Sequence, residues 1–375
     1  MTSAFGGQRS IQLSYGCVRR SDSAGGAACQ AFPTGDYRLM SAGMFRFVLF
    51  VLAAIFAGPL IAACSDNPDV RAKVDAARAR NDAPPIWVVT DPNNALGKLY
   101  IFGAVHILPE GFDWMREDLE AAFNQSGTLF FEAPRDEAAQ NRAAVITAGN
   151  GYYSPPQTLP DILDGYNRRR LVAATLNAGL PDGALDSYQP WLAADILAIA
   201  ALEEAGMSGS HGADQALHDR AAAQGKYTRY LETIDEHLAG SAILPPTLQK
   251  SELITTIDRL DDLARQTALM NAAWVSGNTD YIDSEILAPL RAKAPEYYEA
   301  LFTRRNERWA ETLAPFVKDG GEGLAVIGIG HMLGDGNLAQ QLETRGLIVK
   351  RHYAFLGNNV IKTVPLDMGR PVRGE

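Results

Sequence analysis

The segment KLYIFGAVH, residues 98–106, decides the fold. Its aromatic and β-branched residues favour a buried strand, and the run ends with Gly103 and, three positions later, His106. The pattern returns near the other end of the chain in LAVIGIGH, residues 324–331, where Gly328 precedes His331. If the two strands share one sheet, both histidines would lie at the sheet edge where α/β proteins place ligands.

Composition limits the possible classes of protein. The chain has 375 residues and is 47% hydrophobic, which is enough for one large core or two modest ones. Its formal net charge is -10 and it has no Lys/Arg-rich tract, so we expect no nucleic-acid partner. Cys17, Cys29 and Cys64 all precede the expected folded body, which therefore has neither a structural disulfide nor a cysteine metal site.

A secretory signal is predicted for residues 44–63, where a basic start and an apolar run lead into small residues. The ending LIAAC, residues 60–64, resembles a bacterial lipoprotein box, in which the cysteine is lipidated and becomes the mature N-terminus. Ser65 comes next, which by the usual sorting rule favours the outer membrane. The alternative is an uncleaved anchor, since residues 45–63 have the length of a spanning helix, but Pro59 and the alanines favour cleavage.

Four segments are expected along the chain. They are 1–43, a disordered and non-native upstream extension; 44–63, the signal; 64–85, a linker; and 86–375, the folded domain. Translation would then start at Met44 or Met40, because a signal belongs at the start of a chain. A lipid on Cys64 would tether the domain to the cell envelope, on its periplasmic face.

The folded body begins with strands, continues with helices and ends with a strand–helix–strand unit. The expected strands are 86–91, 98–102, 127–134, 226–231, 324–329 and 347–353. The expected helices are 112–124, 189–205, 214–224, 246–275, 296–317 and 337–345. This order predicts an α/β fold whose mixed central sheet is built from N-terminal and C-terminal strand units, with a large helical insertion between them.

Three side chains that could bind a metal come directly after predicted buried strands: His106, Glu132 and His331. Two imidazoles and a carboxylate suit a catalytic divalent ion that keeps one position for water, which would support metal-assisted hydrolysis. Each also has an ordinary alternative. A histidine after a strand can be a hydrogen-bonded loop residue, and Glu132 could cap the turn at Ala133 or pair with Arg305.

Three further polar residues are candidates for the site. Glu232 ends the short central strand, and Asp214 shares a possible helical stripe with His211 and His218, which could bind metal but is more simply an exposed helix start. Arg305 lies on a long helix and would be solvated unless it faces the site, where a guanidinium could hold a substrate carboxylate or an oxyanion. The chain has no HExxH, G-x-S-x-G or P-loop motif, so serine-hydrolase chemistry lacks support.

Residues 86–353 resemble the TraB/GumN family, which is related to the TIKI membrane-associated metalloproteases. The matching segments, in family order, are Trp87 with LYIFGAVHILP, FFEAP, QPWLAADI, Gly212-x-Asp214, Leu231-Glu232-Thr233, Arg305-Asn306 and VIGIGHMLGDGNLAQQLETRGLIVKR. The paired Gly-x-x-His motifs of the family fall on Gly103/His106 and Gly328/His331, and its strand-end glutamate falls on Glu132. Ala104-Val105 departs from the usual Thr-Ile or Thr-Val, which removes one hydroxyl and leaves both histidines in place.

The resemblance implies an α/β fold with pseudo-related halves and a metal-dependent hydrolase site, with manganese or cobalt as the ion and zinc as an alternative. We therefore expect a lipid-anchored envelope hydrolase, in its most specific form a peptidase, acting on a peptide or small-molecule substrate. His106, Glu132 and His331 would hold the metal, and a set of catalytic or orienting residues would surround it. That set is Glu132, Asp214, Glu232 and Arg305. The rival is a binding or inhibitory module that captures a ligand in the same cleft without turnover.

Overall fold

The computed structural model describes residues 83–242 and 245–352. The predicted upstream extension 1–43, the signal 44–63, Cys64 and nearly all of the linker lie outside these ranges. Within the described ranges, no helix combines the length and the apolarity that crossing a membrane requires.

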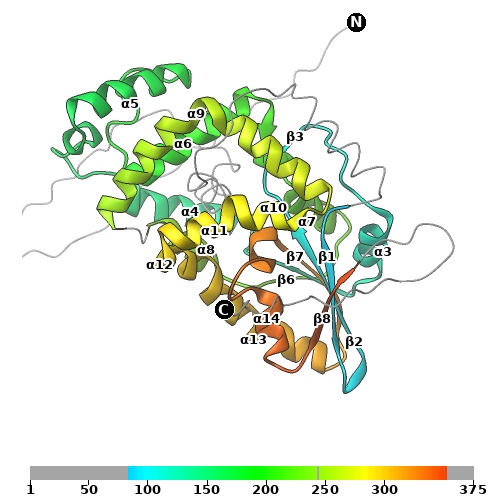
Figure 1. Cartoon of the computed structure of the whole chain (residues 1–375). Coiled ribbons are helices and arrows are strands. Elements are labelled where there is room, and N and C mark those ends of the chain that lie inside the picture. The colour runs from blue at the N-terminus through cyan, green and yellow to red at the C-terminus, as the bar shows by residue number, and fades with distance from the viewer. Residues whose placement is uncertain (1–82, 243–244, 353–375) are drawn as a thin grey trace, which may run out of the picture. The chain divides into compact units, whose positions relative to one another are not determined.

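A six-stranded sheet lies at the centre of the described body (Figure 1). Its strands are β1 (Ile86–Asp91), β2 (Asn94–Ala104), β4 (Thr128–Phe131), β6 (Thr228–Tyr230), β7 (Glu322–Gly328) and β8 (Ile348–His352), in the spatial order β6-β4-β7-β2-β1-β8. The first four in that order pair in parallel, whereas β1 is antiparallel to both β2 and β8. The sheet is mixed and joins strands from both ends of the chain, which confirms the expected fold class.

The two strands that precede the Gly-x-x-His histidines are direct neighbours. β2 and β7 pair in parallel, with Gly103 opposite Ile327 and Ala104 opposite Gly328. Six of the seven residues of β7 are buried, which suits a central parallel strand covered on both faces. Their carboxyl ends therefore lie side by side.

Some helices cover the sheet, and others form a separate layer beyond it. The helices are α3 (Glu117–Gln125), α4 (Glu137–Asn150), α5 (Gly165–Asn177), α6 (Pro190–Glu204), α7 (Ala213–Ala223), α8 (Ile234–Ala242), α9 (Pro246–Val275), α10 (Thr279–Ile282), α11 (Ala288–Lys293), α12 (Pro295–Tyr298), α13 (Arg304–Lys318) and α14 (Leu338–Glu343). The helices α13, α14, α3 and α7 pack against strands, while α5, α6 and α9 pack on one another away from the sheet (Figure 1). A two-residue pair, β3 (Leu108–Pro109) with β5 (Met207–Ser208), forms a second small sheet.

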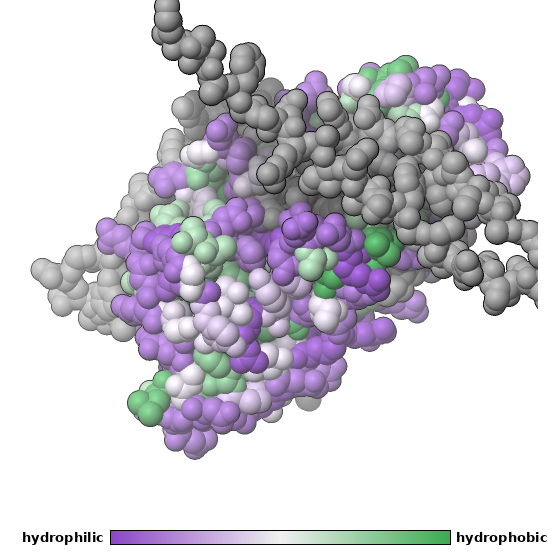
Figure 2. Space-filling model, turned by 180° about the vertical axis from the view of Figure 1, so that it is seen from behind, coloured by the Kyte–Doolittle hydropathy of each residue, from purple (hydrophilic) through white to green (hydrophobic). Residues whose placement is uncertain are grey.

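On the face shown in Figure 2, hydrophilic residues prevail outside the grey atoms, and hydrophobic residues are scattered over it. Singly exposed apolar residues such as Leu96 and Tyr166 are usual on a globular surface.

Two expected helices differ from the structure. The helix expected over 112–124 begins at Glu117, because Phe112 and Met115 pack on the core from an irregular segment and the backbone of Arg116 is extended. Acidic residues occupy the first turn of α3, where the helix dipole favours them.

The helix expected over 296–317 is interrupted. A π-helical turn, Glu299–Thr303, separates α12 from α13. Such a turn adds a residue and rotates the next helical turns about the helix axis, and it often occurs at functional sites. Beyond it, Arg305 and Asn306 are buried, so the solvated alternative for Arg305 is wrong.

Close packing of β2 on α13 can be tested at Gly97. A Cβ atom on Gly97 would lie 1.8 Å from the carbonyl oxygen of Val317, a backbone atom that cannot easily move. We expect Gly97→Ala to lower the free energy of unfolding by about 1–3 kcal/mol, measured by urea denaturation. Gly149→Ala is the matched control, because Gly149 is helical with open space around it and should gain up to about 1 kcal/mol. Equal stability of Gly97→Ala and wild type would contradict this packing.

Candidate functional site

Four polar side chains come after the ends of four adjacent parallel strands. Glu232 follows β6, Glu132 follows β4, His331 follows β7 and His106 follows β2. Parallel strands end at the same edge of a sheet, so segments far apart in sequence meet there. His106, Glu132, Arg305 and His331 all line one cavity of about 20 Å³, which is large enough for a water molecule or an ion.

Gly328 allows two of these side chains to approach each other. A Cβ atom on Gly328 would lie 3.0 Å from His106 Nε2 and 3.2 Å from Glu132 Oε1. The backbone N–H of Gly328 also donates a hydrogen bond of 2.6 Å to Glu132 Oε1. The glycine of the second Gly-x-x-His motif therefore makes room for the imidazole and anchors the carboxylate.

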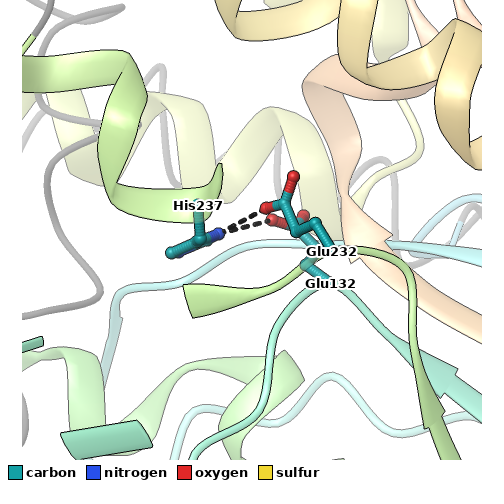
Figure 3. Close-up of side chains that lie close together, drawn as sticks. All are labelled: Glu132, Glu232 and His237. Atoms are coloured by element: carbon teal, nitrogen blue, oxygen red, sulfur yellow. Dashed lines mark hydrogen bonds and ion pairs between the residues drawn. The ribbon is translucent and has the colours of Figure 1, made fainter. Parts of the chain in front are cut away.

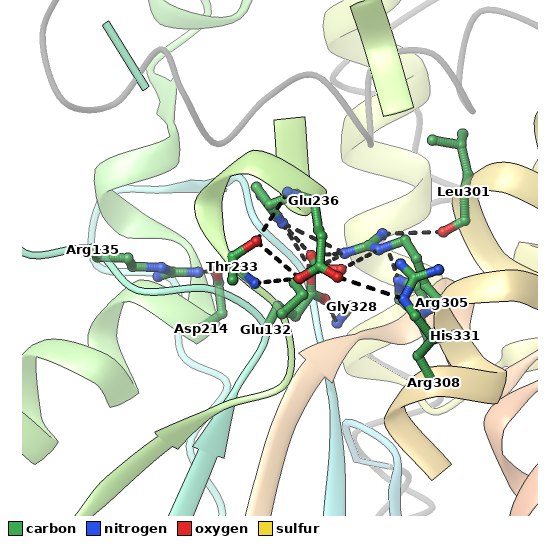
Figure 4. Close-up of polar contacts among 12 residues, drawn as sticks. Glu132, Arg135, Asp214, Thr233, Glu236, Leu301, Arg305, Arg308, Gly328 and His331 are labelled. Carbon is green, nitrogen blue, oxygen red and sulfur yellow. Dashed lines mark hydrogen bonds and ion pairs between the residues drawn. The ribbon is translucent and has the colours of Figure 1, made fainter. Parts of the chain in front are cut away.

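Arg305, on α13, bonds to both Glu132 and Glu232, and Figure 4 shows it beside Glu132 and His331. Its Nε and Nη2 donate to the two oxygens of Glu232 at 2.9 and 2.6 Å, and Nη2 also donates to Glu132 Oε2 at 3.0 Å. Its Nη1 donates to the Leu301 carbonyl and to His331 Nε2. These contacts engage all five N–H donors of the guanidinium, which favours a positioning role over substrate binding.

The charge of Arg305 sets the ionisation of both glutamates. Burial alone would raise the pKa of these carboxyl groups, but the guanidinium outweighs it and lowers the pKa of Glu132 and of Glu232 to about 2. Both carboxylates are therefore ionised at neutral pH, the state in which they could bind a cation. Of the ordinary alternatives for Glu132, a cap on the turn at Ala133 or a pair with Arg305, the structure has the pair with Arg305.

His237, which the sequence interpretation missed, joins the same group (Figure 3). Its Nδ1 lies 2.6 Å from Glu232 Oε1 and 3.9 Å from Glu132 Oε2. One ligand atom from each of these three residues lies within 4.8 Å of the others, so the group could hold a metal ion. This group that could hold a metal contains Glu132, one of the three predicted ligands, together with Glu232 and His237. The predicted ligands His106 and His331 are not part of it.

A local signal could have pointed to His237. Thr233 and Glu236 form reciprocal hydrogen bonds, Thr233 N–H to Glu236 Oε2 and Glu236 N–H to Thr233 Oγ1. This is the capping-box pattern Thr-x-x-Glu, which marks a helix start. A helix that starts directly after Glu232 places His237 about one turn above that glutamate.

Asp214 pairs with His106 through the ring nitrogen Nδ1. This nitrogen lies 2.9 Å from Asp214 Oδ2, which also accepts from Nη2 of Arg135. Burial would lower the pKa of His106, but the Asp214 carboxylate prevails and raises it. Asp214 lies in the first turn of α7, as the helix-start interpretation predicted, but it is 2% exposed, so the expected exposure is wrong. The predicted stripe does not form one helix face, because His211 belongs to a 3₁₀ turn before α7 and His218 packs on Phe131.

His331 is neutral and engaged at both ring nitrogens. Its Nδ1 lies 2.7 Å from Asn306 Oδ1, and its Nε2 lies 3.0 Å from Arg305 Nη1. Burial and then the Arg305 charge lower its pKa well below the ordinary value, so Nδ1 carries the proton and Nε2 accepts. His331 lines the cavity beside the metal-binding group, and it would have to give up Arg305 to bind a metal through Nε2.

Removing the guanidinium should destabilise the fold. Arg305→Met leaves two buried carboxylates without the guanidinium that opposes their charge, which costs about 3–5 kcal/mol in the free energy of unfolding. Arg304→Met is the matched control on the same helix, because the Arg304–Glu299 pair is exposed and its loss should change stability little. Similar denaturation midpoints for the two variants would show that the contacts of Arg305 with Glu132 and Glu232 do not stabilise the fold.

The lowered pKa values also predict a pH dependence. Carboxyls with a folded-state pKa of about 2 contribute stability that is present above about pH 4.5 and is lost as the pH falls towards 2. We expect the free energy of unfolding of wild type to decrease over this window. Glu132→Gln/Glu232→Gln should be less stable at pH 7 but show a smaller decrease in acid. If the free energy of unfolding fell equally with decreasing pH in both proteins, the lowered pKa values of Glu132 and Glu232 would be contradicted.

Comparison with known proteins supports the resemblance seen in the sequence. Residues 85–351 match the family model described as the TraB/PrgY/gumN family. Neither the curated proteins nor the solved structures give a match. The matched range contains every residue of the candidate site described above and most of the chain. The chain therefore belongs to the TraB/PrgY/gumN family.

Proposed function

We propose that this protein is a metal-dependent hydrolase of the cell envelope and that the candidate site is its active centre. The observation that carries the proposal is the buried group of Glu132, Glu232 and His237, with its ligand atoms within 4.8 Å of one another. One imidazole and two carboxylates suit manganese, cobalt or zinc. The resemblance to TIKI metalloproteases supports manganese or cobalt and, as the most specific activity, peptide hydrolysis.

The donor types suit such an ion. Arg305 Nη2 lies within hydrogen-bond distance of all three ligand atoms, so the guanidinium would have to move for these residues to hold an ion. The guanidinium contacts Glu132 Oε2 and Glu232 Oε1, the same atoms that face His237. A divalent ion held there would polarise a carbonyl and lower the pKa of a bound water.

The chain supplies further groups around the cavity. His106, backed by Asp214, presents Nε2 beside Gly328 and Glu132, where it can donate a proton to a leaving group. Arg305 holds both carboxylates ionised and in place, and Asn306 fixes the tautomer of His331. His106 and His331 have pKa values shifted in opposite directions, an arrangement that suits a division between acid and base.

The envelope location is part of the proposal and depends on the sequence. The signal over residues 44–63 and the LIAAC ending support a lipid on Cys64 that tethers the domain to the membrane, facing the periplasm and sorted to the outer membrane. Labelling with a radioactive fatty acid tests this, because Cys64→Ala should abolish incorporation and release the protein from the membrane fraction.

A second candidate is a binding or inhibitory module without turnover. Arg305 favours it, because the guanidinium already balances the two carboxylates without a metal. Such a site would bind a peptide or small ligand and leave it intact.

Metal uptake separates the two candidates. After dialysis against Mn²⁺, Co²⁺ or Zn²⁺, we expect about one ion per chain in wild type and loss of most of it in His237→Ala and Glu232→Gln, because each change removes a ligand. His352→Ala is the control, since His352 lies on the edge strand β8, which is not adjacent to any of the four strands of the site, and pairs with Asp118. His106→Ala should keep the ion but lose peptide cleavage. A folded wild type that takes up no ion would leave only the binding module.

A further inference from the structure

A second group of buried polar side chains lies between α6, α9 and α12. Asp195 on α6 is 4% exposed, Glu252 and Thr256 on α9 are 2% and 1% exposed, and Tyr297 on α12 is 5% exposed. Buried carboxylates are normally paired or hydrogen-bonded, because leaving them unsatisfied is costly. These four residues belong to none of the contacts of the candidate site.

The oxygens of this group lack partners. Several of its buried oxygens make no hydrogen bond to any residue that the structure describes. They are Asp195 Oδ2, both carboxylate oxygens of Glu252, Thr256 Oγ1 and Tyr297 Oη. The carboxyl groups therefore do not bond to each other or to the nearby hydroxyls. A ligand placed between them could engage all these oxygens at once.

The helices that carry the two carboxyl groups are neighbours. The helices α6 and α9 pack along each other, and Thr256 follows Glu252 by one helical turn on the same face. Electrostatic interactions link Asp195, Glu252 and Tyr297. After burial, which is the largest cause, Asp195 raises the pKa of Glu252, and both carboxyls raise the pKa of the Tyr297 hydroxyl.

No basic side chain in the described part of the chain balances these acids. The pKa of Asp195 is raised by burial to about 8, and no cation opposes that shift. Protonation would remove the charges, but no partner lies within hydrogen-bond distance of Asp195 Oδ2 or of either oxygen of Glu252, so the added O–H groups would also be left unsatisfied. A cation would neutralise the two carboxylates and satisfy the oxygens together.

We propose that Asp195, Glu252, Thr256 and Tyr297 form a second cation site, suited to a hard divalent ion such as Ca²⁺. All its donors are oxygens and two are carboxylates, which is the ligand preference of Ca²⁺ and differs from the imidazole-containing group at the sheet edge. The site would join three helices, and Tyr297 lies just before the π-helical turn that precedes Arg305. This inference does not depend on the proposed hydrolase function.

Calcium titration of the full chain tests the site. After removal of metals with EDTA, Ca²⁺ at about one hundred times its dissociation constant should raise the Tm of wild type by about 5 °C or more. Glu252→Gln and Asp195→Asn should lose this shift. Glu296→Gln should keep it, because Glu296 is an exposed carboxylate next to Tyr297 on the same helix. Without Ca²⁺, Glu252→Gln should be at least as stable as wild type, which shows that the variant folds.

Three results would overturn the inference. An equal Ca²⁺ response in wild type and Glu252→Gln would mean that the ion binds elsewhere, and no response in either would mean that these carboxyls bind no Ca²⁺. A response lost in His237→Ala but kept in Glu252→Gln would place the ion at the sheet edge. A response lost only in His237→Ala would leave the proposed function intact and overturn the calcium site. Failure of Mn²⁺ uptake, together with a Ca²⁺ response lost only in Glu252→Gln, would overturn the proposed function and support the calcium site.

Discussion

The contact of Arg305 with Glu132 and Glu232 is the interaction on which the site depends. The two carboxylates come after neighbouring parallel strands, and in a buried place they would repel each other. One guanidinium bonds to both and keeps both ionised, because a fork of donors matches carboxylate geometry. The same side chain also donates to His331, so the charge balance and the hydrogen bonds of the cavity have a common origin.

The backbone of the sheet supplies the other half of the arrangement. The strand order β6-β4-β7-β2 sets the order of Glu232, Glu132, Gly328 and His106 along one edge. Gly328 contributes an N–H to Glu132 and has no side chain to separate it from His106. A different strand order, or any larger residue at 328, would pull the acidic and imidazole groups apart. Topology and electrostatics are therefore inseparable here.

The sequence predicted the features that depend on local pattern. Buried parallel strands appear as continuous apolar runs, so β2 and β7 and the meeting of their histidines at one edge were predictable. The direction of Arg305 was not, because it depends on a π-helical turn that apolar periodicity does not reveal. Asp214 looked like an exposed helix residue because its partners, His106 and Arg135, come from other elements. His237 was missed although the capping box Thr233-x-x-Glu236 marks a helix start directly after Glu232.

A comparison of two equally buried acids shows how strongly a partner decides ionisation. Glu132 and Asp195 are both 4% exposed, yet the pKa of the first is lowered to about 2 and that of the second is raised to about 8. The difference is the cationic partner. Glu132 pairs with Arg305, whereas no basic side chain among the described residues pairs with Asp195. Tyr297, Leu301 and Arg305 are spaced at intervals of four residues in a single helical segment, and the Leu301 carbonyl holds the guanidinium. A cation that drew Tyr297 towards Asp195 and Glu252 would therefore act on the segment that delivers Arg305 to the sheet edge.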